Sequence, residues 1–251
     1  MSGPRALAVL IGLFAFGIGV FSWFQRRDVA DVDHAAVVAG AQEVEGMAIA
    51  EPRDVDGPPP APEQGFTALI GSWEGRFHKG GWNHYGPGYV TLDPETGVLA
   101  THGGMGLFWY AAETFGDFVL RLQFQTSKPA SNSGVFVRVP EVPTSDDYIY
   151  HAFEVQIDAS GDGPIHRTGA VYDAVGPSVE AARAPGEWND MEISFVGDRI
   201  IVVLNGTQVV DWEAEPAGKV EDFAARGYIG LQNHDADSSV WFRNVRVKSL
   251  D

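Results

Sequence analysis

The chain contains no cysteine among its 251 residues. This absence excludes disulfide bonds, thiolate metal sites and a cysteine nucleophile. Basic residues are also scarce, since 17 lysines and arginines stand against 34 acidic residues, which gives a net charge of −17. Nucleic-acid binding requires a basic surface over the phosphates, so nucleic acid is excluded as a partner as well.

Several catalytic and metal-binding patterns are also missing. The chain has no glycine-rich phosphate loop after a strand, no nucleophile-elbow serine and no His-Glu-x-x-His motif. Residues 158–163 match the first half of an EF-hand calcium loop, but Gly169 stands where the twelfth residue should be acidic. The sequence therefore implies no cofactor firmly and predicts no metal ligand, and a divalent metal stays open as an alternative.

The first 27 residues contain a long uncharged run, from residue 6 to residue 24. About 20 apolar residues span the hydrocarbon core of a bilayer as a helix. The run ends in Trp23-Phe24-Gln25-Arg26-Arg27, which fits the aromatic and basic border of a membrane. We expect residues 1–27 to form a transmembrane signal-anchor helix, with a cleaved signal peptide as the alternative and the orientation left open.

Residues 28–63 are expected to form a disordered linker. They carry nine acidic residues against one arginine and end in a proline-rich stretch, Pro58-Pro59-Pro60-Ala61-Pro62. Such a composition buries little apolar surface, and its prolines stiffen it as a spacer. The two segments together predict a membrane-anchored, extracytoplasmic domain, in the periplasm or at the cell surface, or a secreted one if the first segment is cleaved.

Residues 64–251 are expected to form one domain built from short strands with glycine- and proline-rich turns between them. Residues 117–125 alternate in polarity, and Asn205-Gly206 between two apolar runs predicts a β-hairpin with a type I′ turn. Short helices are expected only around 178–183 or 220–225. This pattern predicts an all-β, antiparallel jelly-roll sandwich.

Two of the expected strands, 132–138 and 151–158, contain the candidate site. In the second strand Glu154, Gln156 and Asp158 fall on one face, and apolar side chains occupy the other. Arg138 in the neighbouring strand would face this polar row. Such a floor of acid, amide and guanidinium groups suits a hydroxyl-rich ligand, so we expect a carbohydrate.

Seven short motifs follow one another along the predicted domain, at residues 116–121, 132–138, 154–158, 168–172, 186–189, 204–206 and 242–246. In this order they resemble the 3-keto-disaccharide hydrolase family of bacterial secreted proteins, and the resemblance covers about residues 64–251. It implies a fold similar to the concanavalin A-like lectin/glucanase jelly roll. It also implies cleavage of 3-keto-glycosides in the periplasm, often by elimination followed by hydration.

The chemistry that the resemblance implies requires three kinds of group. A base removes the acidified C2 proton of the 3-keto sugar, a cation stabilises the enolate oxygen, and an acid assists the leaving group at C1. Glu154 is the candidate base, because apolar walls would raise its pKa. Arg138 is the candidate oxyanion clamp, and His166 is the candidate acid or ligand.

The residues expected to bind substrate are Gln156, Asp158, Asn132, Tyr172, His151, Trp109, Gln232 and His234. Gln156 would orient hydroxyl groups, and Trp109 or Tyr172 would stack on a sugar ring. A plainer interpretation stays open, in which Glu154 and Arg138 form a buried structural ion pair and the histidines are surface residues.

Direct hydrolysis by two carboxylates is disfavoured by spacing. Glu154 and Asp158 are four residues apart, about 13 Å along a strand, whereas retaining and inverting enzymes need about 5–5.5 Å and 6.5–9.5 Å. A non-catalytic carbohydrate-binding module and a structural envelope protein are the remaining alternatives. A catalytic Glu154 would lie in a pocket with Arg138 and a histidine, a lectin would have a shallow groove, and a structural protein would have the polar row covered.

Overall fold

The structure is a computed structural model, and it describes residues 63–158, 160 and 163–251. The predicted transmembrane segment and all but the last residue of the predicted linker lie outside this part, so the boundaries at residues 27 and 63 stay predictions. Within the described residues, no helix has the length and apolar character needed to cross a membrane.

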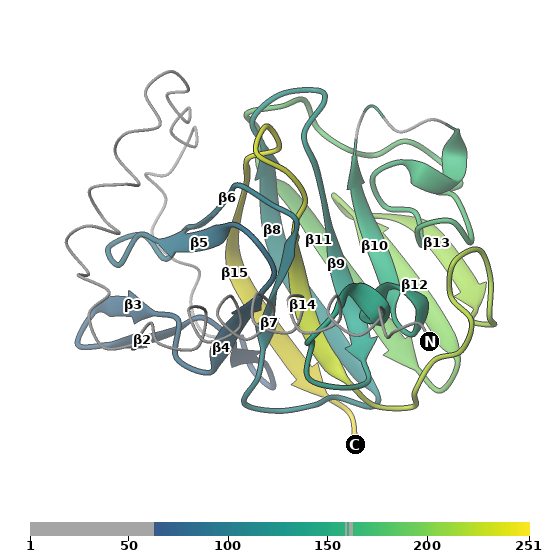
Figure 1. The fold of residues 1–251 in the computed structure, drawn as a ribbon, viewed down its shortest axis with the longest axis horizontal. Coiled ribbons are helices and arrows are strands. Elements are labelled where there is room, and N and C mark those ends of the chain that lie inside the picture. The colour runs from purple at the N-terminus through teal and green to yellow at the C-terminus, as the bar shows by residue number, and fades with distance from the viewer. Residues whose placement is uncertain (1–62, 159, 161–162) are drawn as a thin grey trace, which may run out of the picture. The chain divides into compact units, whose positions relative to one another are not determined.

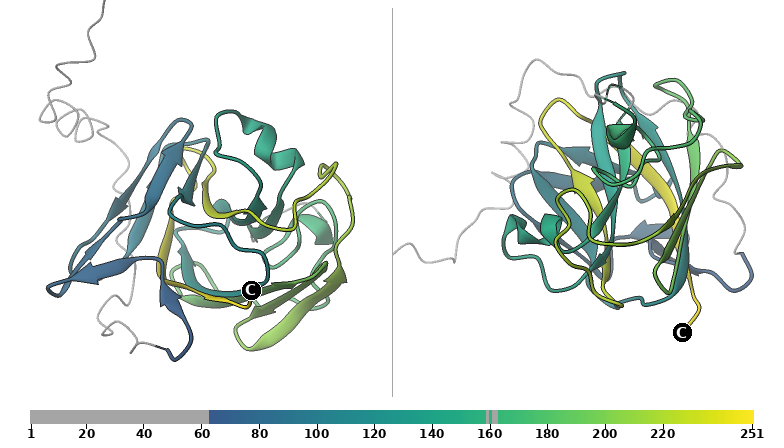
Figure 2. Two further views of the ribbon diagram at one scale, coloured as in Figure 1. Left: turned by 90° about the horizontal axis from the view of Figure 1, so that it is seen from below. Right: turned by 90° about the vertical axis from the view of Figure 1, so that its right-hand side faces the viewer.

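Two antiparallel sheets pack face to face (Figures 1 and 2). The larger sheet contains β5 (Tyr89–Leu92), β6 (Leu99–His102), β8 (Phe118–Thr126), β11 (Asn189–Val196), β12 (Arg199–Leu204), β13 (Thr207–Glu213) and β15 (Val240–Ser249). Its strand order is β13-β12-β11-β8-β15-β6-β5, and the short strand β1 (Thr67–Ala68) also pairs with β15. The smaller sheet contains β4 (Trp82–Tyr85), β7 (Gly106–Tyr110), β9 (Asn132–Val139), β10 (Phe153–Asp158) and β14 (Tyr228–Asn233). Its strand order is β10-β9-β14-β7-β4. A separate hairpin pairs β2 (Gly71–Trp73) with β3 (Arg76–His78). The predicted antiparallel β-sandwich is confirmed.

The core fills the space between the two sheets. The alternating side chains of β8, from Phe118 to Phe124, are 2% exposed or less. They belong to one apolar cluster with Val135 of β9 and Val155 of β10, which come from the opposite sheet. Burying each such side chain contributes about 1.5–3 kcal/mol. The polar residues between them in sequence therefore point outward, and this places the polar row of β10 on the outer face of the smaller sheet.

The hairpin predicted at Asn205-Gly206 is confirmed. Strands β12 and β13 are paired, and the two turn residues have φ angles of +52° and +81°. A type I′ turn needs positive φ at both central residues, which asparagine and glycine tolerate best.

The short helices expected at 178–183 and 220–225 do not form. The backbone of each segment bonds to other parts of the fold: Ser178 N–H donates to Val209 O at 2.7 Å, and Glu221 N–H donates to Tyr150 O at 2.8 Å. Among the described residues, the helical segments are two short 3₁₀ helices, η1 (Asp146–Tyr150) and η2 (Pro164–His166).

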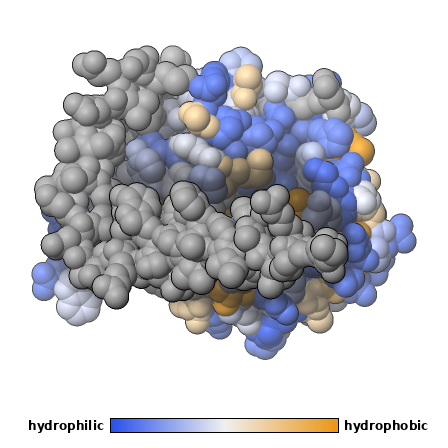
Figure 3. Space-filling view, in the orientation of Figure 1, coloured by the Kyte–Doolittle hydropathy of each residue, from blue (hydrophilic) through white to orange (hydrophobic). Residues whose placement is uncertain are grey.

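Much of the described surface is polar, in keeping with the excess of acidic residues. Figure 3 shows one face, where the described residues are mostly hydrophilic and hydrophobic residues are scattered. Large exposed apolar side chains such as Trp73 of β2, which is 73% exposed, occur singly. Isolated exposures of this kind are ordinary on folded domains and indicate no particular site.

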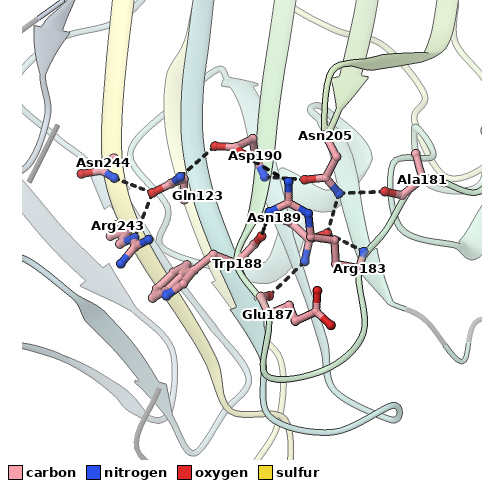
Figure 4. Close-up of polar contacts among 10 residues, drawn as sticks. All are labelled: Gln123, Ala181, Arg183, Glu187, Trp188, Asn189, Asp190, Asn205, Arg243 and Asn244. Atoms are coloured by element: carbon pink, nitrogen blue, oxygen red, sulfur yellow. Dashed lines mark hydrogen bonds and ion pairs between the residues drawn. The ribbon is translucent and has the colours of Figure 1, made fainter. Parts of the chain in front are cut away.

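Asn189 and Asn205 brace the loop that enters β11 (Figure 4). Asn205 Nδ2 donates to Asn189 Oδ1 at 2.9 Å and to Ala181 O at 2.7 Å. The backbone N–H of Arg183 donates to the same Asn189 oxygen at 2.8 Å. Both asparagine side chains therefore satisfy loop backbone that has no partner in a sheet.

A second group of contacts crosses three neighbouring strands beside this brace (Figure 4). Arg243 Nε and Asn244 Nδ2 of β15 both donate to Gln123 Oε1 of β8. Gln123 Nε2 donates to Asp190 Oδ1 of β11 at 2.8 Å. The Arg243 guanidinium also lies 4.0 Å from the ring centroid of Trp188. The motifs at 186–189, 204–206 and 242–246 thus meet in a structural network on the larger sheet.

Candidate functional site

A pocket of about 130 Å³ lies against the polar row of the smaller sheet. Its polar lining consists of Asn132, Glu154, Gln156, Tyr172, Lys219, Gln232 and His234, and its apolar walls include Phe136 and Val220. Asn132 comes from β9, Glu154 and Gln156 from β10, and Gln232 from β14. Three adjacent strands and several connecting segments therefore build the pocket, although its lining residues, from Met105 to His234, are as far as 129 positions apart in sequence.

The register of β9 and β10 explains how the polar row is presented. Gln156 lies opposite Gly134, and Glu154 lies opposite Phe136. A Cβ atom at Gly134 would overlap Glu154 Oε1, so only glycine leaves room for the carboxyl group where it lies. The absence of a side chain on β9 thus creates the space for the functional group of β10.

Glu154 is strongly perturbed by this environment. The residue is partly exposed to the pocket, but its Oε1 atom is buried and has no hydrogen-bond partner within the described part of the chain. Burial raises the pKa of Glu154 to about 8, and the positive charge of Lys219 acts in the opposite direction. A carboxyl group with a pKa near neutral pH is suited to proton transfer.

The oxygen atoms of three amide side chains that line the same pocket also have no hydrogen-bond partner in the described part of the chain. Asn132 Oδ1, Gln156 Oε1 and Gln232 Oε1 are buried and have no hydrogen-bond partner among the described residues. Leaving a buried polar group unpaired costs about 1–3 kcal/mol. A sugar hydroxyl both donates and accepts, so it can satisfy an amide in either orientation. The three amides are therefore suited to binding neighbouring hydroxyl groups.

Tyr172, Gln232 and His234 line the pocket, so the structure brings them together with Glu154. Asn132 Nδ2 donates to Asp158 Oδ2 at 3.3 Å, and Asp158 also accepts from Ser160, so Asp158 supports the pocket wall without lining it.

His166, His151 and Trp109 do not line the pocket. The His166 ring lies 4.9 Å from the Tyr172 ring, outside the lining residues. His151 pairs with Asp222 at 2.5 Å in a separate hollow. Trp109 is 4% exposed and packs edge-on against Tyr228. The structure does not bring these three into the pocket with Glu154, and their roles stay predictions.

Arg138 lies on the other face of β9 from the expected one. Between Tyr228 and Gly230 the pairing of β14 with β9 shifts, so that Val137 and Arg138 together oppose Ile229. Arg138 has a φ of +54° in this bulge. The extra residue breaks the alternation on which the expectation rested and turns the side chain into the core.

The Arg138 side chain is 1% exposed, and its guanidinium lies 3.5 Å from the ring centroid of Phe195. Its Nε donates to Gly116 O at 3.0 Å and its Nη2 to Asp117 Oδ1 at 3.2 Å. The ion pair that Arg138 forms is therefore with Asp117 and not with Glu154.

Replacing Arg138 with alanine is expected to destabilise the fold by roughly 2–4 kcal/mol, through a cavity and an unpaired Gly116 carbonyl. The kcat of the folded protein should not change. Urea unfolding and steady-state kinetics would measure the two effects. Arg199→Ala is the matched control, since Arg199 pairs with Asp211 at the surface and its loss should change the stability much less. A large loss of kcat at unchanged stability would contradict the structural role.

Lys219 is the polar lining residue that the sequence analysis missed. It lies in the loop after β13, where a single lysine beside Gly218 carries no periodic or motif signal. The metal alternative remains open: no group of three histidine or acidic residues within the described part could hold a metal ion, but Asp162 of the EF-hand-like stretch lies outside that part.

A sequence profile and a named relative match this chain. The sequence profile of the 3-keto-alpha-glucoside-1,2-lyase-like domain matches residues 67–248. The chain is 25% identical over 221 residues to a 3-keto-disaccharide hydrolase of Bacteroides thetaiotaomicron. The match covers 68% of this chain and 75% of that protein. The resemblance derived from the sequence motifs is confirmed.

Solved structures support the same assignment. A candidate glycosyl hydrolase of Parabacteroides distasonis ATCC 8503 superposes with a TM-score of 0.61 at 28% identity, over 74% of this chain and 99% of that one. A second one from the same organism has a TM-score of 0.62 at 23% identity, over 74% and 94% of the two chains, and shows the fold alone. The chain belongs to the 3-keto-alpha-glucoside-1,2-lyase-like domain family.

Proposed function

We propose that this domain cleaves 3-keto-glycosides by elimination across C1 and C2, with Glu154 as the general base. The observation that carries the proposal is the buried Oε1 of Glu154, which has no partner among the described residues and shares its pocket with three unpaired amide oxygens. The family assignment supplies the substrate class, and the name of the Bacteroides relative agrees with it.

The proposed reaction needs one base. The ionised carboxylate of Glu154 takes the C2 proton, and the C–H electron pair forms the C2=C3 bond of an enolate with its charge on O3. The enolate then restores the C3 carbonyl, forms a C1=C2 bond and expels the aglycone oxygen, which takes up a proton. Water added across C1=C2 returns a free 3-keto sugar, so elimination and hydration together equal hydrolysis.

The lining of the pocket supports elimination over displacement by two carboxylates. Among the described residues that line it, Glu154 has the one carboxyl group. Asp158 is already engaged by Asn132 and Ser160. A single base suffices for elimination, because the 3-keto group and not a nucleophile weakens the bond to the leaving group.

A non-catalytic carbohydrate-binding module is the second candidate. Such a module would present a shallow groove with exposed aromatic side chains. The concave pocket and the raised pKa of Glu154 favour catalysis over binding alone. The uncharged stretch at residues 6–24 supports placing this activity on a membrane-anchored, extracytoplasmic protein.

The test is product analysis with the full chain. With 3-keto-glucosides carrying a chromogenic aglycone, the protein should release the aglycone, and NMR should detect the unsaturated 2-hydroxy-3-keto product or its hydrate. The matching glucosides with an intact 3-hydroxyl should be inert, because their C2 proton is not acidified. Binding of sugars with no release from any 3-keto-glucoside would favour the binding module instead.

A further inference from the structure

Lys219 places a cation at the pocket beside Tyr172. Its Nζ lies 3.5 Å from the Tyr172 hydroxyl and 4.9 Å from the centroid of the Tyr172 ring. Both residues line the same pocket as Glu154. Of the described lining residues, Lys219 is the one lysine or arginine. The base thus comes from the sheet, and the cation comes from a loop.

The loop that carries Lys219 is held in place on both sides of the residue. Gly218 has a φ of +55°, and a Cβ atom there would overlap the carbonyl oxygen of Asp173. The chain therefore approaches the Tyr172-Asp173 segment as closely as only glycine permits. Val220 is 6% exposed and joins the apolar core. These two contacts fix the backbone of Lys219, although its side chain is itself exposed.

We propose that Lys219 is the electrophilic catalytic residue of this site, which holds the O3 oxygen of the substrate and stabilises the enolate that forms there. The inference rests on the proposed function. Arg138, the residue first expected in this role, lies in the core with Gly116 and Asp117. The elimination moves one negative charge from Glu154 to O3, so a cation in the same pocket as the base lowers the energy of that step.

Replacing Lys219 with methionine keeps most of the side-chain volume and removes the charge. We expect Lys219→Met to lower kcat by about 10²–10³-fold, the loss typical of one oxyanion-stabilising group, with a smaller change in KM. Lys219→Arg should recover part of the activity. Lys248→Met is the matched control, because Lys248 is exposed on β15, outside the pocket lining. An unchanged kcat in Lys219→Met would overturn the inference.

Hydrogen exchange at C2 separates this role from a role at the leaving group. In D₂O, the enolate takes up deuterium at C2 before the aglycone leaves. If Lys219 stabilises the enolate, Lys219→Met should slow C2 exchange and aglycone release together. If Lys219 assists the leaving group through Tyr172, exchange would persist while release falls, and this result would overturn the inference.

The activity of the wild-type protein separates the proposed function from the proposed role of Lys219. Wild-type turnover combined with unaffected Lys219→Met would contradict the role of Lys219 and leave the proposed function standing. Failure of the wild type to cleave or exchange any 3-keto-glucoside would contradict the proposed function, and the role of Lys219 with it. Circular dichroism and urea unfolding of each variant would establish that the folded proteins are compared.

Discussion

Glu154→Gln is expected to lower the rate of aglycone release by about 10²–10⁴-fold, the range that general-base catalysis contributes. Glutamine has the same shape but cannot accept the C2 proton. The space that Gly134 leaves for the carboxyl group should hold the amide of glutamine equally well, so the pocket should remain intact. Steady-state kinetics with a chromogenic 3-keto-glucoside would measure the loss.

Two further observations are needed for the result to identify a base. The unoxidised glucoside, used as a ligand in NMR titration, should bind Glu154→Gln about as well as the wild type, since Asn132, Gln156 and Gln232 are unchanged. Glu113→Gln, at an exposed position outside the pocket, should keep full activity. Wild-type rates in Glu154→Gln would exclude Glu154 as the base and would direct attention to His234.

The same substitution is expected to stabilise the protein in a pH-dependent manner. Burial raises the pKa of Glu154 to about 8 in the folded state, from the model-peptide value of 4.5. Below pH 4.5 the carboxyl group is neutral in both the folded and unfolded states and costs nothing. Between pH 4.5 and pH 8 the unfolded state ionises while the folded state keeps the proton, so the stability falls as the pH rises. The loss levels off above pH 8, where the folded state also carries the charge.

The expected difference in the free energy of unfolding follows from the size of the shift. Relative to Glu154→Gln, the wild type should lose up to roughly 5 kcal/mol between pH 4.5 and pH 9, at 1.36 kcal/mol for each pKa unit. The neighbouring titratable groups, Tyr148, Tyr172, Lys219 and His234, are present in both proteins, so their contributions largely cancel in the comparison.

Urea unfolding of both proteins at several pH values would measure this difference. Parallel stability curves would mean that Glu154 titrates as an ordinary exposed carboxyl group. The pH profile of kcat/KM gives an independent measure, because it reports the pKa of the free enzyme. A base must be ionised, so kcat/KM should rise with pH and level off above about 8. A profile that falls over this range would assign Glu154 as an acid.

The sequence by itself determined the class of fold and the strand that carries the site. Alternating polarity is a local property, and it identified β8 and the polar row of β10 because one face of each strand packs into a common core. The Asn205-Gly206 turn was equally local, since two positive φ angles in succession leave few residue types. The family resemblance rested on the order of the motifs, which needs no three-dimensional information.

The tertiary structure alone decided which motif residues meet at the pocket. Asn132, Glu154 and Gln156 line it. Asn189, Asn205 and Arg243 instead brace the larger sheet. These two groups look alike in sequence, because polar side chains that hold loops and polar side chains that hold ligands are of the same types.

Arg138 and Lys219 show most directly why local sequence patterns do not determine which side chains reach the pocket. One extra residue in β9 reverses the face on which Arg138 lies, and a bulge of this kind depends on the pairing with β14. Lys219 reaches the pocket because Gly218 packs against Asp173, 45 residues earlier in the chain. Periodicity fixes the direction of a side chain only within a regular strand, whereas contacts between distant segments are set by how the whole chain packs.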